Sequence, residues 1–310
     1  MLREKVLDVL FSEEITQKEL TSRLKSSRSR ISEVLKQLER EKLITRKRVS
    51  ERTVLVSLNH SRTLRVGVVR SSEYAHVVSA LYGLEEKVPF RLKVYENSLE
   101  ALRDLVTGYQ DIVASPMISG YFFHLIDNNI KPIAGVAMGG AGLIKRSEGG
   151  KIGTTPLSRM DKDSREYKNY ERTYYRSIDD ILQAYRKREI DAAEIWEPFL
   201  SINKGIGKSP SGMCCCLFTQ VNDRKSIELF LENYLESVET GLPRAKRKRT
   251  AEILSGLIGV KEKAIDASFD SYIFTASISR IDVENQIASF GLPQVKGVEN
   301  FLERCSKVSL

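Results

Sequence analysis

Short apolar runs alternate with segments of helical periodicity along most of this 310-residue chain, beginning at Leu64. The first apolar runs, each of strand length, cover residues 64–69, 91–95, 111–114 and 133–138, with helical periodicity at 74–84 and 99–108 between them. A chain that alternates in this way folds into layers, because helices must cover the apolar faces of the strands. The pattern therefore predicts an α/β fold.

The same alternation starts again near residue 151. Strands are expected at 151–155, 172–175, 191–196 and 212–219, a helix at 178–188, and later helices at 224–240, 244–257 and 261–269. Two successive α/β lobes, with late helices that return to the first lobe, suit a hinged clamshell over residues 61–310. We expect lobe one to hold about residues 64–145 and 220–310, and lobe two about residues 146–219.

Residues 1–60 carry a different pattern, which predicts a separate domain of three helices and a hairpin. Val6, Leu7 and Leu10 have the spacing of a first helix, and Thr16 with Glu19 fits a capping box that begins a second. Residues 31, 34, 35 and 38 are apolar and lie on one face of a third helix, which runs to about residue 42. Residues 43–48 and 53–58 are expected to form two strands.

Most of the excess positive charge of the chain lies in this domain. Residues 23–52 hold eleven Lys or Arg against four acidic residues, whereas residues 61–310 hold 35 against 32. A basic module on a nearly neutral body indicates a polyanionic partner. The order of helices and basic hairpin, including LKQLEREKLI at residues 35–44, resembles the winged helix-turn-helix of bacterial and archaeal transcription regulators.

This resemblance implies that the third helix enters the major groove of double-stranded DNA and that the hairpin is a wing. Arg can bridge guanine with two hydrogen bonds, and Lys36 is expected to meet phosphate. The candidate DNA contacts are Ser27, Arg28, Ser29, Arg30, Ser32, Lys36, Arg46, Lys47, Arg48 and Arg52. Two other interpretations stay open: a solvated helical cap, and a winged helix that binds protein.

Two phrases in the body resemble a second family. The sequence DAAEIWEPF at residues 191–199 resembles the second-lobe strand of the type II periplasmic-binding-protein fold, in the branch of sulfonate, nitrate and thiamine-pyrimidine binding proteins. KIGTTP at residues 151–156 resembles the entry of that branch into lobe two, and the match spans roughly residues 64–280. The resemblance implies a small-molecule effector, anionic or heterocyclic, bound between the lobes.

In open α/β sheets such a ligand lies at the C-terminal ends of strands. The candidate ligand-binding residues are Ser71, Ser72, Tyr74, His76, Ser115, Gly139, Gly140, Thr154, Thr155, Glu194, Trp196 and Glu197. Strand alternation places Glu194 and Trp196 on one face. Core packing for Trp196, and simple turn or cap chemistry for Ser71 and Thr154, are the alternatives.

Three consecutive cysteines, Cys214, Cys215 and Cys216, are expected on one strand. Alternation would put Cys214 and Cys216 on one face and Cys215 on the other, so the three could not surround one tetrahedral ion. We expect them to pack as small apolar side chains and to bind no metal.

The run at residues 214–219 is also similar to the cysteine-rich strand of fungal enzymes that build the thiamine pyrimidine from their own histidine and pyridoxal phosphate, with iron. His76 lies near the position of the donor histidine of that family. However, residues 107–112 lack the family's lysine, and Phe218 stands where a further cysteine is expected. We therefore expect no catalytic residue and no cofactor.

The chain has no run of about 18 apolar residues and no secretory signal, so we expect a cytoplasmic protein without a membrane partner. The first hypothesis is a homodimeric, ligand-responsive transcription regulator that is not an enzyme. A second is a cytoplasmic enzyme or binding protein of thiamine-pyrimidine metabolism with an appended regulatory head. A third, a solute-binding partner of a transporter, is opposed by the basic head.

Overall fold

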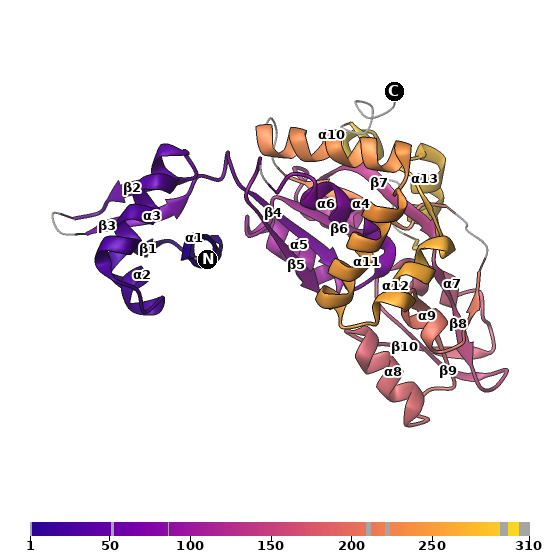
Figure 1. Ribbon diagram of the computed structural model, residues 1–310. Coiled ribbons are helices and arrows are strands. Elements are labelled where there is room, and N and C mark those ends of the chain that lie inside the picture. The colour runs from indigo at the N-terminus through magenta and orange to yellow at the C-terminus, as the bar shows by residue number, and fades with distance from the viewer. Residues whose placement is uncertain are drawn as a thin grey trace.

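The computed structural model describes residues 2–50, 53–85, 87–208, 212–220, 224–291 and 297–303. Within these residues the strands form a three-stranded, a five-stranded and a six-stranded sheet. Figure 1 shows a small N-terminal unit set apart from a larger body. None of the helices in the described ranges combines the length and the apolar character that crossing a membrane would require.

The N-terminal unit contains the three helices and the hairpin that its apolar spacing predicts, with one short strand added. Its elements are α1 (Leu2–Ser12), β1 (Ile15–Thr16), α2 (Gln17–Arg23), α3 (Arg28–Arg40), β2 (Ile44–Arg48) and β3 (Val54–Leu58). β3 pairs with β1 and β2, antiparallel to both. Leu10, Leu20 and Leu35, one from each helix, are buried in the shared core. The β2–β3 hairpin projects away from the body (Figure 1).

Side-chain hydrogen bonds cap the first turns of α2 and α3, and α2 begins where the sequence predicted it. Thr16 Oγ1 accepts a hydrogen bond from the Glu19 N–H at 3.2 Å, and the Glu19 carboxylate accepts one from the Thr16 N–H at 2.9 Å. Ser27 Oγ accepts from the Arg30 N–H at 3.3 Å. These oxygens satisfy N–H groups that have no partner inside their helices. The predicted capping box is therefore confirmed.

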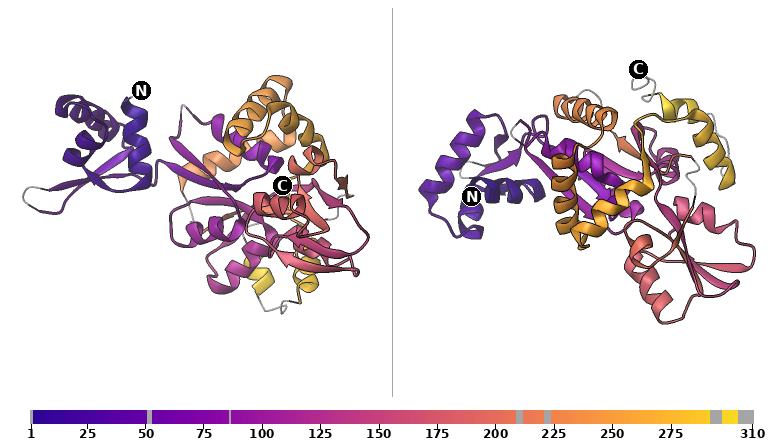
Figure 2. Two further views of the ribbon diagram at one scale, coloured as in Figure 1. Left: turned by 90° about the horizontal axis from the view of Figure 1, so that it is seen from below. Right: turned by 45° about the vertical axis from the view of Figure 1, so that its right-hand side comes forward.

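Lobe one is a six-stranded sheet of order β14-β7-β13-β6-β4-β5. Its strands are β4 (Leu64–Val69), β5 (Phe90–Tyr95), β6 (Ile112–Pro116), β7 (Lys131–Gly139), β13 (Cys215–Thr219) and β14 (Tyr272–Phe274). Its helices are η1 (Ser72–Tyr74), α4 (Ala75–Tyr82), α5 (Ser98–Val106), α6 (Met117–Ile126), α10 (Lys225–Thr240), α11 (Arg244–Ile258), α12 (Glu262–Ser268), η2 (Phe269–Ser271), α13 (Arg280–Ser289) and α14 (Gly297–Leu302). Side chains of α4 and α10 share one apolar cluster, and those of α5, α6 and α13 share another. Helices thus cover both faces of the sheet (Figure 2).

Lobe two is built on the five-stranded sheet, of order β10-β9-β11-β8-β12. Its elements are β8 (Ala141–Lys145), β9 (Gly150–Thr154), α7 (Arg159–Ser164), β10 (Tyr170–Tyr174), α8 (Ile178–Arg186), β11 (Ala192–Trp196), α9 (Phe199–Ile202) and β12 (Ile206–Gly207). The core of this lobe joins Ile181 and Leu182 of α8 to Trp196 and Phe199.

Strand pairing places the boundary between the lobes differently from the division expected from the sequence. β8 pairs with β11 in lobe two, although it precedes residue 146, and β13 pairs with β6 and β7 in lobe one, although it precedes residue 220. The chain crosses to lobe two at residues 139–141 and returns between residues 207 and 215. Apolar alternation marks a strand but does not specify which sheet it will join.

Candidate ligand cleft

A cavity of about 430 Å³ lies between the two lobes, where strand ends from both sheets meet. Val69, Pro116 and Gly139, at the ends of β4, β6 and β7, line it together with Trp196 at the end of β11. Its volume lies in the usual range of small-molecule sites. The aromatic lining residues are Tyr74, Tyr174, Tyr175, Trp196 and Tyr272.

Several of the ligand residues expected from the sequence do line this cavity. They are Ser71, Tyr74, Gly139, Gly140, Thr155 and Trp196. Ser71 also caps η1, which was the alternative interpretation of this residue, because its Oγ accepts a hydrogen bond from the Glu73 N–H at 3.1 Å. Trp196 likewise packs in the core of lobe two, and its Nε1 donates to the Arg70 carbonyl across the cleft at 2.8 Å.

Ser72, Ser115 and Thr154 are buried beside the cavity and do not line it. Ser72 Oγ accepts a hydrogen bond from Ser268 Oγ at 2.8 Å, which ties η1 to the end of α12. Ser115 and Thr154 are enclosed at the ends of β6 and β9, and the residues that follow each of them reach the cavity instead. At β6 the candidate therefore missed by one residue, which reverses the side-chain direction in extended chain, whereas at β9 the second candidate, Thr155, does line the cavity.

His76 lies away from the cavity, contrary to the expectation that it is a ligand residue. Its Nδ1 lies 2.9 Å from Ser237 Oγ of α10, and its ring meets the edge of the Phe274 ring at a centroid distance of 4.6 Å. Burial lowers the pKa of His76 to about 4. The first turn of α4 begins next to the cleft, but helix geometry directs this side chain toward α10.

Glu194 does not reach the cavity with Trp196. Its carboxylate is completely buried and lies 2.9 Å from Lys208 Nζ, which also lies over the Tyr167 ring. Burial raises the pKa of Glu194, and the Lys208 charge opposes that shift. A buried carboxylate needs a cationic partner, and lobe two supplies it internally.

Glu197 holds the chain at the junction of the lobes and does not line the cavity. Its carboxylate accepts hydrogen bonds from the Ser201 N–H at 3.2 Å and from Ser201 Oγ at 2.7 Å. Its carbonyl accepts from the Ser72 N–H and from Tyr272 Oη, each at 3.3 Å. The residue therefore joins β11 of lobe two to η1 and β14 of lobe one.

Other residues of the lining were not singled out in the sequence. Glu73 follows two of the predicted serines, and the segment from Asn97 to Glu100 comes shortly after the predicted strand at 91–95. Position after a strand was the available signal for both. Tyr272 comes from the three-residue β14, which is too short to show any periodicity.

Glu73 is the most perturbed acid of the cavity. It is buried, its Oε1 has no hydrogen-bond partner among the described residues, and its Oε2 accepts a hydrogen bond from Cys215 Sγ at 3.2 Å. Burial raises the pKa of this carboxyl group to about 7, although the bonds from Cys215 and Cys214 lower it. A polar ligand group in the cavity would thus meet an acceptor oxygen that is not otherwise satisfied.

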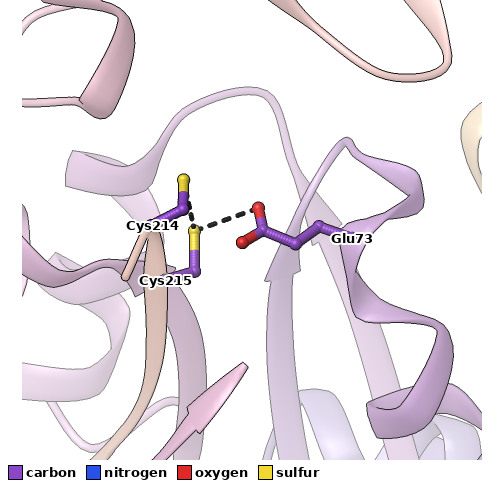
Figure 3. Close-up of side chains that lie close together, drawn as sticks. All are labelled: Glu73, Cys214 and Cys215. Atoms are coloured by element: carbon purple, nitrogen blue, oxygen red, sulfur yellow. Dashed lines mark hydrogen bonds between the residues drawn. The ribbon is translucent and has the colours of Figure 1, made fainter. Parts of the chain in front are cut away.

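The cysteines are arranged differently from the alternation expected from the sequence. Cys214 and Cys215 both line the cavity, with their Sγ atoms 3.6 Å apart, and Figure 3 shows both beside Glu73. Cys216 instead packs in the apolar cluster on the α5 and α6 side of the sheet. Cys215 and Cys216 lie within β13 and face opposite sides, whereas Cys214 precedes the strand. Cys214 and Cys215 can share one side because strand alternation does not extend to residue 214.

Ion pairs and hydrogen bonds cross the cleft beside the cavity. Arg70 of lobe one lies 2.6 Å from Asp179 of lobe two, and Glu100 pairs with Arg176. Ser119 Oγ donates to the Leu157 carbonyl at 2.5 Å. These contacts hold the lobes together in this structure.

The predicted DNA contacts within the described residues belong to α3, its cap and β2. Arg28, Ser29, Arg30 and Lys36 of α3 are exposed, Ser32 is half-buried, and Ser27 is the exposed cap of the helix. Arg46, Lys47 and Arg48 of β2 are also exposed, and Arg46 lies 3.1 Å from Glu39. Arg52 falls outside the described residues.

Solved structures similar to this protein match the body of the chain. No protein-family model and no curated protein sequence matches the chain. The ligand binding component of an ABC-type import system from Staphylococcus aureus, with zinc bound, is similar in structure with a TM-score of 0.63 and 13% identity, over 74% of this chain and 91% of that one. The periplasmic aliphatic sulphonate binding protein of Escherichia coli has a TM-score of 0.55 and 13% identity, over 77% and 91%.

A Candida albicans protein described as having the generic periplasmic binding protein fold is also similar, with a TM-score of 0.57 and 10% identity, over 79% of this chain and 94% of that one. Structural similarity at such low sequence identity shows that the fold is shared, and it does not show that the ligand is shared. The body of this protein therefore has the two-lobed α/β fold of periplasmic binding proteins, as its sequence predicted.

Proposed function

We propose that this protein is a DNA-binding transcription regulator whose body senses a small molecule in the cleft between its lobes. The observation that carries the proposal is the cationic exposed face of α3 next to the basic hairpin of β2 and β3. The helix and hairpin order of this unit is that of a winged helix-turn-helix. A DNA-binding head on a ligand-binding body is the arrangement of a one-component regulator.

The two faces of α3 support a role in DNA recognition. Ile31, Leu35 and Leu38 fix one face in the core, which leaves Arg28 and Lys36 on the outside. Cationic side chains near the N-terminal end of a recognition helix can reach base edges and phosphates. The hairpin adds three further cations from β2, so that a helix and a wing would contact the duplex together.

The cleft supports a small, flat or anionic effector. Its aromatic rings can stack on a heterocycle, and the N-terminal turn of α5, which Asn97 caps, forms part of its wall. Structural neighbours include a sulphonate-binding protein, which favours an acidic ligand group without assigning one to this chain.

The strand β4 connects the N-terminal unit to the cleft. Residues 59–63 connect β3 to this strand, and Arg224 Nη2 donates to the Thr63 carbonyl at 3.0 Å just before β4 begins. The other end of β4 reaches the cavity at Val69. Arg91 Nη1 also donates to Ser12 Oγ of α1 at 2.7 Å. An effector that favours one lobe arrangement would thereby shift the orientation of the heads.

Retention of duplex DNA at increasing salt concentration tests this function. We expect the full chain to bind a duplex at low ionic strength and the affinity to fall steeply with salt, because phosphate contacts release counterions. Arg28→Ala and Lys36→Ala should each weaken binding, and removal of one phosphate contact should lower the salt slope by about 0.9.

Arg186→Ala is the matched control, because it removes an exposed cation of α8 in lobe two. It should leave DNA affinity unchanged. A chain that shows no salt-dependent retention, or an Arg186→Ala effect equal to that of Arg28→Ala, would contradict the proposed role of the head.

The proposed active form is a homodimer in the cytoplasm that places two heads on paired half-sites. Sedimentation of the chain with duplex DNA should give two chains per duplex, and a single chain per duplex would oppose this form. The alternative of a thiamine-pyrimidine enzyme loses its main support, because His76 is enclosed by Ser237 and Phe274 away from the cavity.

A further inference from the structure

Three side chains with metal-binding atoms meet on the wall of the cavity (Figure 3). Glu73 follows β4 in the 3-10 turn η1, whereas Cys214 directly precedes β13 and Cys215 is its first residue. The ligand atoms of all three lie within 4.8 Å of one another. Segments separated by about half the chain therefore present one carboxylate and two thiols to the same point.

The spacing of these atoms is close to that of a zinc site. The two Sγ atoms are 3.6 Å apart, and Cys215 Sγ lies 3.2 Å from Glu73 Oε2. Two thiolates on one tetrahedral zinc ion, with Zn–S bonds of about 2.3 Å, have their sulfurs about 3.8 Å apart. Only small side-chain movements would be needed to enclose an ion.

Burial and an unsatisfied carboxylate oxygen favour the binding of a cation by this cluster. Glu73, Cys214 and Cys215 are 5%, 6% and 2% exposed, and one Glu73 oxygen has no hydrogen-bond partner among the described residues. An unsatisfied buried carboxylate oxygen is costly, and a divalent ion would satisfy it. Thiolate ligands together with a carboxylate suit zinc.

We propose that Glu73, Cys214 and Cys215 bind one Zn²⁺ ion whose fourth coordination position faces the cavity. On binding, each cysteine gives up its thiol proton to solvent, and both sulfurs and a carboxylate oxygen become ligands. The fourth position can then take water or an anionic donor of the effector. The ion would make the cleft selective for ligands that carry such a donor. This site is independent of DNA binding by the head.

Zinc titration of the reduced full-length chain, after removal of metals with a chelator, tests the proposal. We expect one ion per chain in competition with a chromophoric chelator, with release of protons. X-ray absorption of the zinc-loaded protein should give two sulfur neighbours at about 2.3 Å and oxygen in the remaining positions. Absence of binding, or a coordination shell without sulfur, would overturn the proposal.

Variants locate the ion. Cys214→Ser, Cys215→Ser and Glu73→Gln should each weaken zinc binding by at least about a hundredfold, since loss of an outer hydrogen-bond partner alone costs roughly 10–100-fold. Cys216→Ala is the matched control, because this cysteine packs on the other side of the sheet. Full affinity in Cys215→Ser would place the ion elsewhere and refute the site. If a variant fails to fold, the absorption spectrum of the unaltered chain still decides.

Discussion

His76 occupies a site that favours its neutral form. The Ser237 hydroxyl and the Phe274 ring surround it, and no charge is needed to satisfy its Nδ1. The pKa of His76 is lowered from 6.5 to about 4, because burial disfavours the cationic ring. In the unfolded chain the same ring takes up a proton near its ordinary pKa.

A specific pH dependence of stability follows. The unfolded state binds the proton first as pH falls through 6.5, so the folded state loses stability from there down to about pH 4. The loss of unfolding free energy should reach about 3 kcal/mol. Above pH 6.5 this residue should add nothing to the pH dependence of stability. Urea unfolding of the unaltered chain and of His76→Gln between pH 4 and 7 measures it. Parallel curves for the two proteins would contradict this assignment.

Gly140 is fixed by the close approach of Tyr272 at the crossing between the lobes. Its φ is +65°, and an added Cβ would lie 1.9 Å from Tyr272 Cε1. Gly140→Ala should cost about 2–4 kcal/mol of unfolding free energy, from overpacking together with backbone strain.

Gly108→Ala is the comparison that separates these two causes. Gly108 also has a positive φ, +75°, but nothing lies within 4 Å of the added Cβ. Only the backbone cost of about 1 kcal/mol should then appear. Equal destabilisation of the two variants in thermal unfolding would show that the contact with Tyr272 has no effect.

At the scale of single elements, side-chain caps fix where helices begin, and the capping box of α2 is the clearest case. Thr16→Ala removes the side-chain acceptor of the capping box and should destabilise α2 by about 1 kcal/mol. Amide hydrogen exchange in α2 should become about fivefold faster. Thr16→Ser keeps the acceptor and serves as the control. Unchanged exchange in Thr16→Ala would mean that tertiary packing alone holds this helix.

Most strands of the body were predicted from the sequence, but the sheet that each strand joins was predicted poorly. The apolar runs that became β4, β5 and β11 were visible in the sequence, because burial imposes their composition. The strand β8 was not among those expected from the sequence, and the partners of β13 were not visible, since pairing depends on chain segments far away. The sequence likewise did not show that Cys214 and Cys215 share a side, because Cys214 lies just before β13 begins.

At the scale of the whole molecule, the lobes meet through charged residues that the solvent can reach. Arg176 and Asp179 of lobe two pair with Glu100 and Arg70 across the cleft. The double variant Arg176→Ala, Asp179→Ala should shift the lobes toward an open arrangement. X-ray scattering in solution should then report a larger radius of gyration, and the unaltered chain should respond in the same direction at high salt.

Arg280→Ala is the control for this opening. Arg280 pairs with Glu284 of α13 and with Glu299 of α14, so its loss removes two ion pairs without touching the cleft. Its scattering curve should match that of the unaltered chain. A double variant with an unchanged radius of gyration would show that apolar contacts and hydrogen bonds, such as that of Trp196 with Arg70, hold the lobes.

The sequence by itself determined the α/β class of the body, the helices and hairpin of the N-terminal unit, and the strand ends from which Ser71, Thr155 and Trp196 line the cavity. Each of these depends on local periodicity or capping, which neighbouring residues fix. Only the tertiary structure decided which strand joins which sheet, and that Glu73 meets two thiols 3.6 Å apart. Such contacts join segments far apart in the chain, and no local pattern encodes the distance between them.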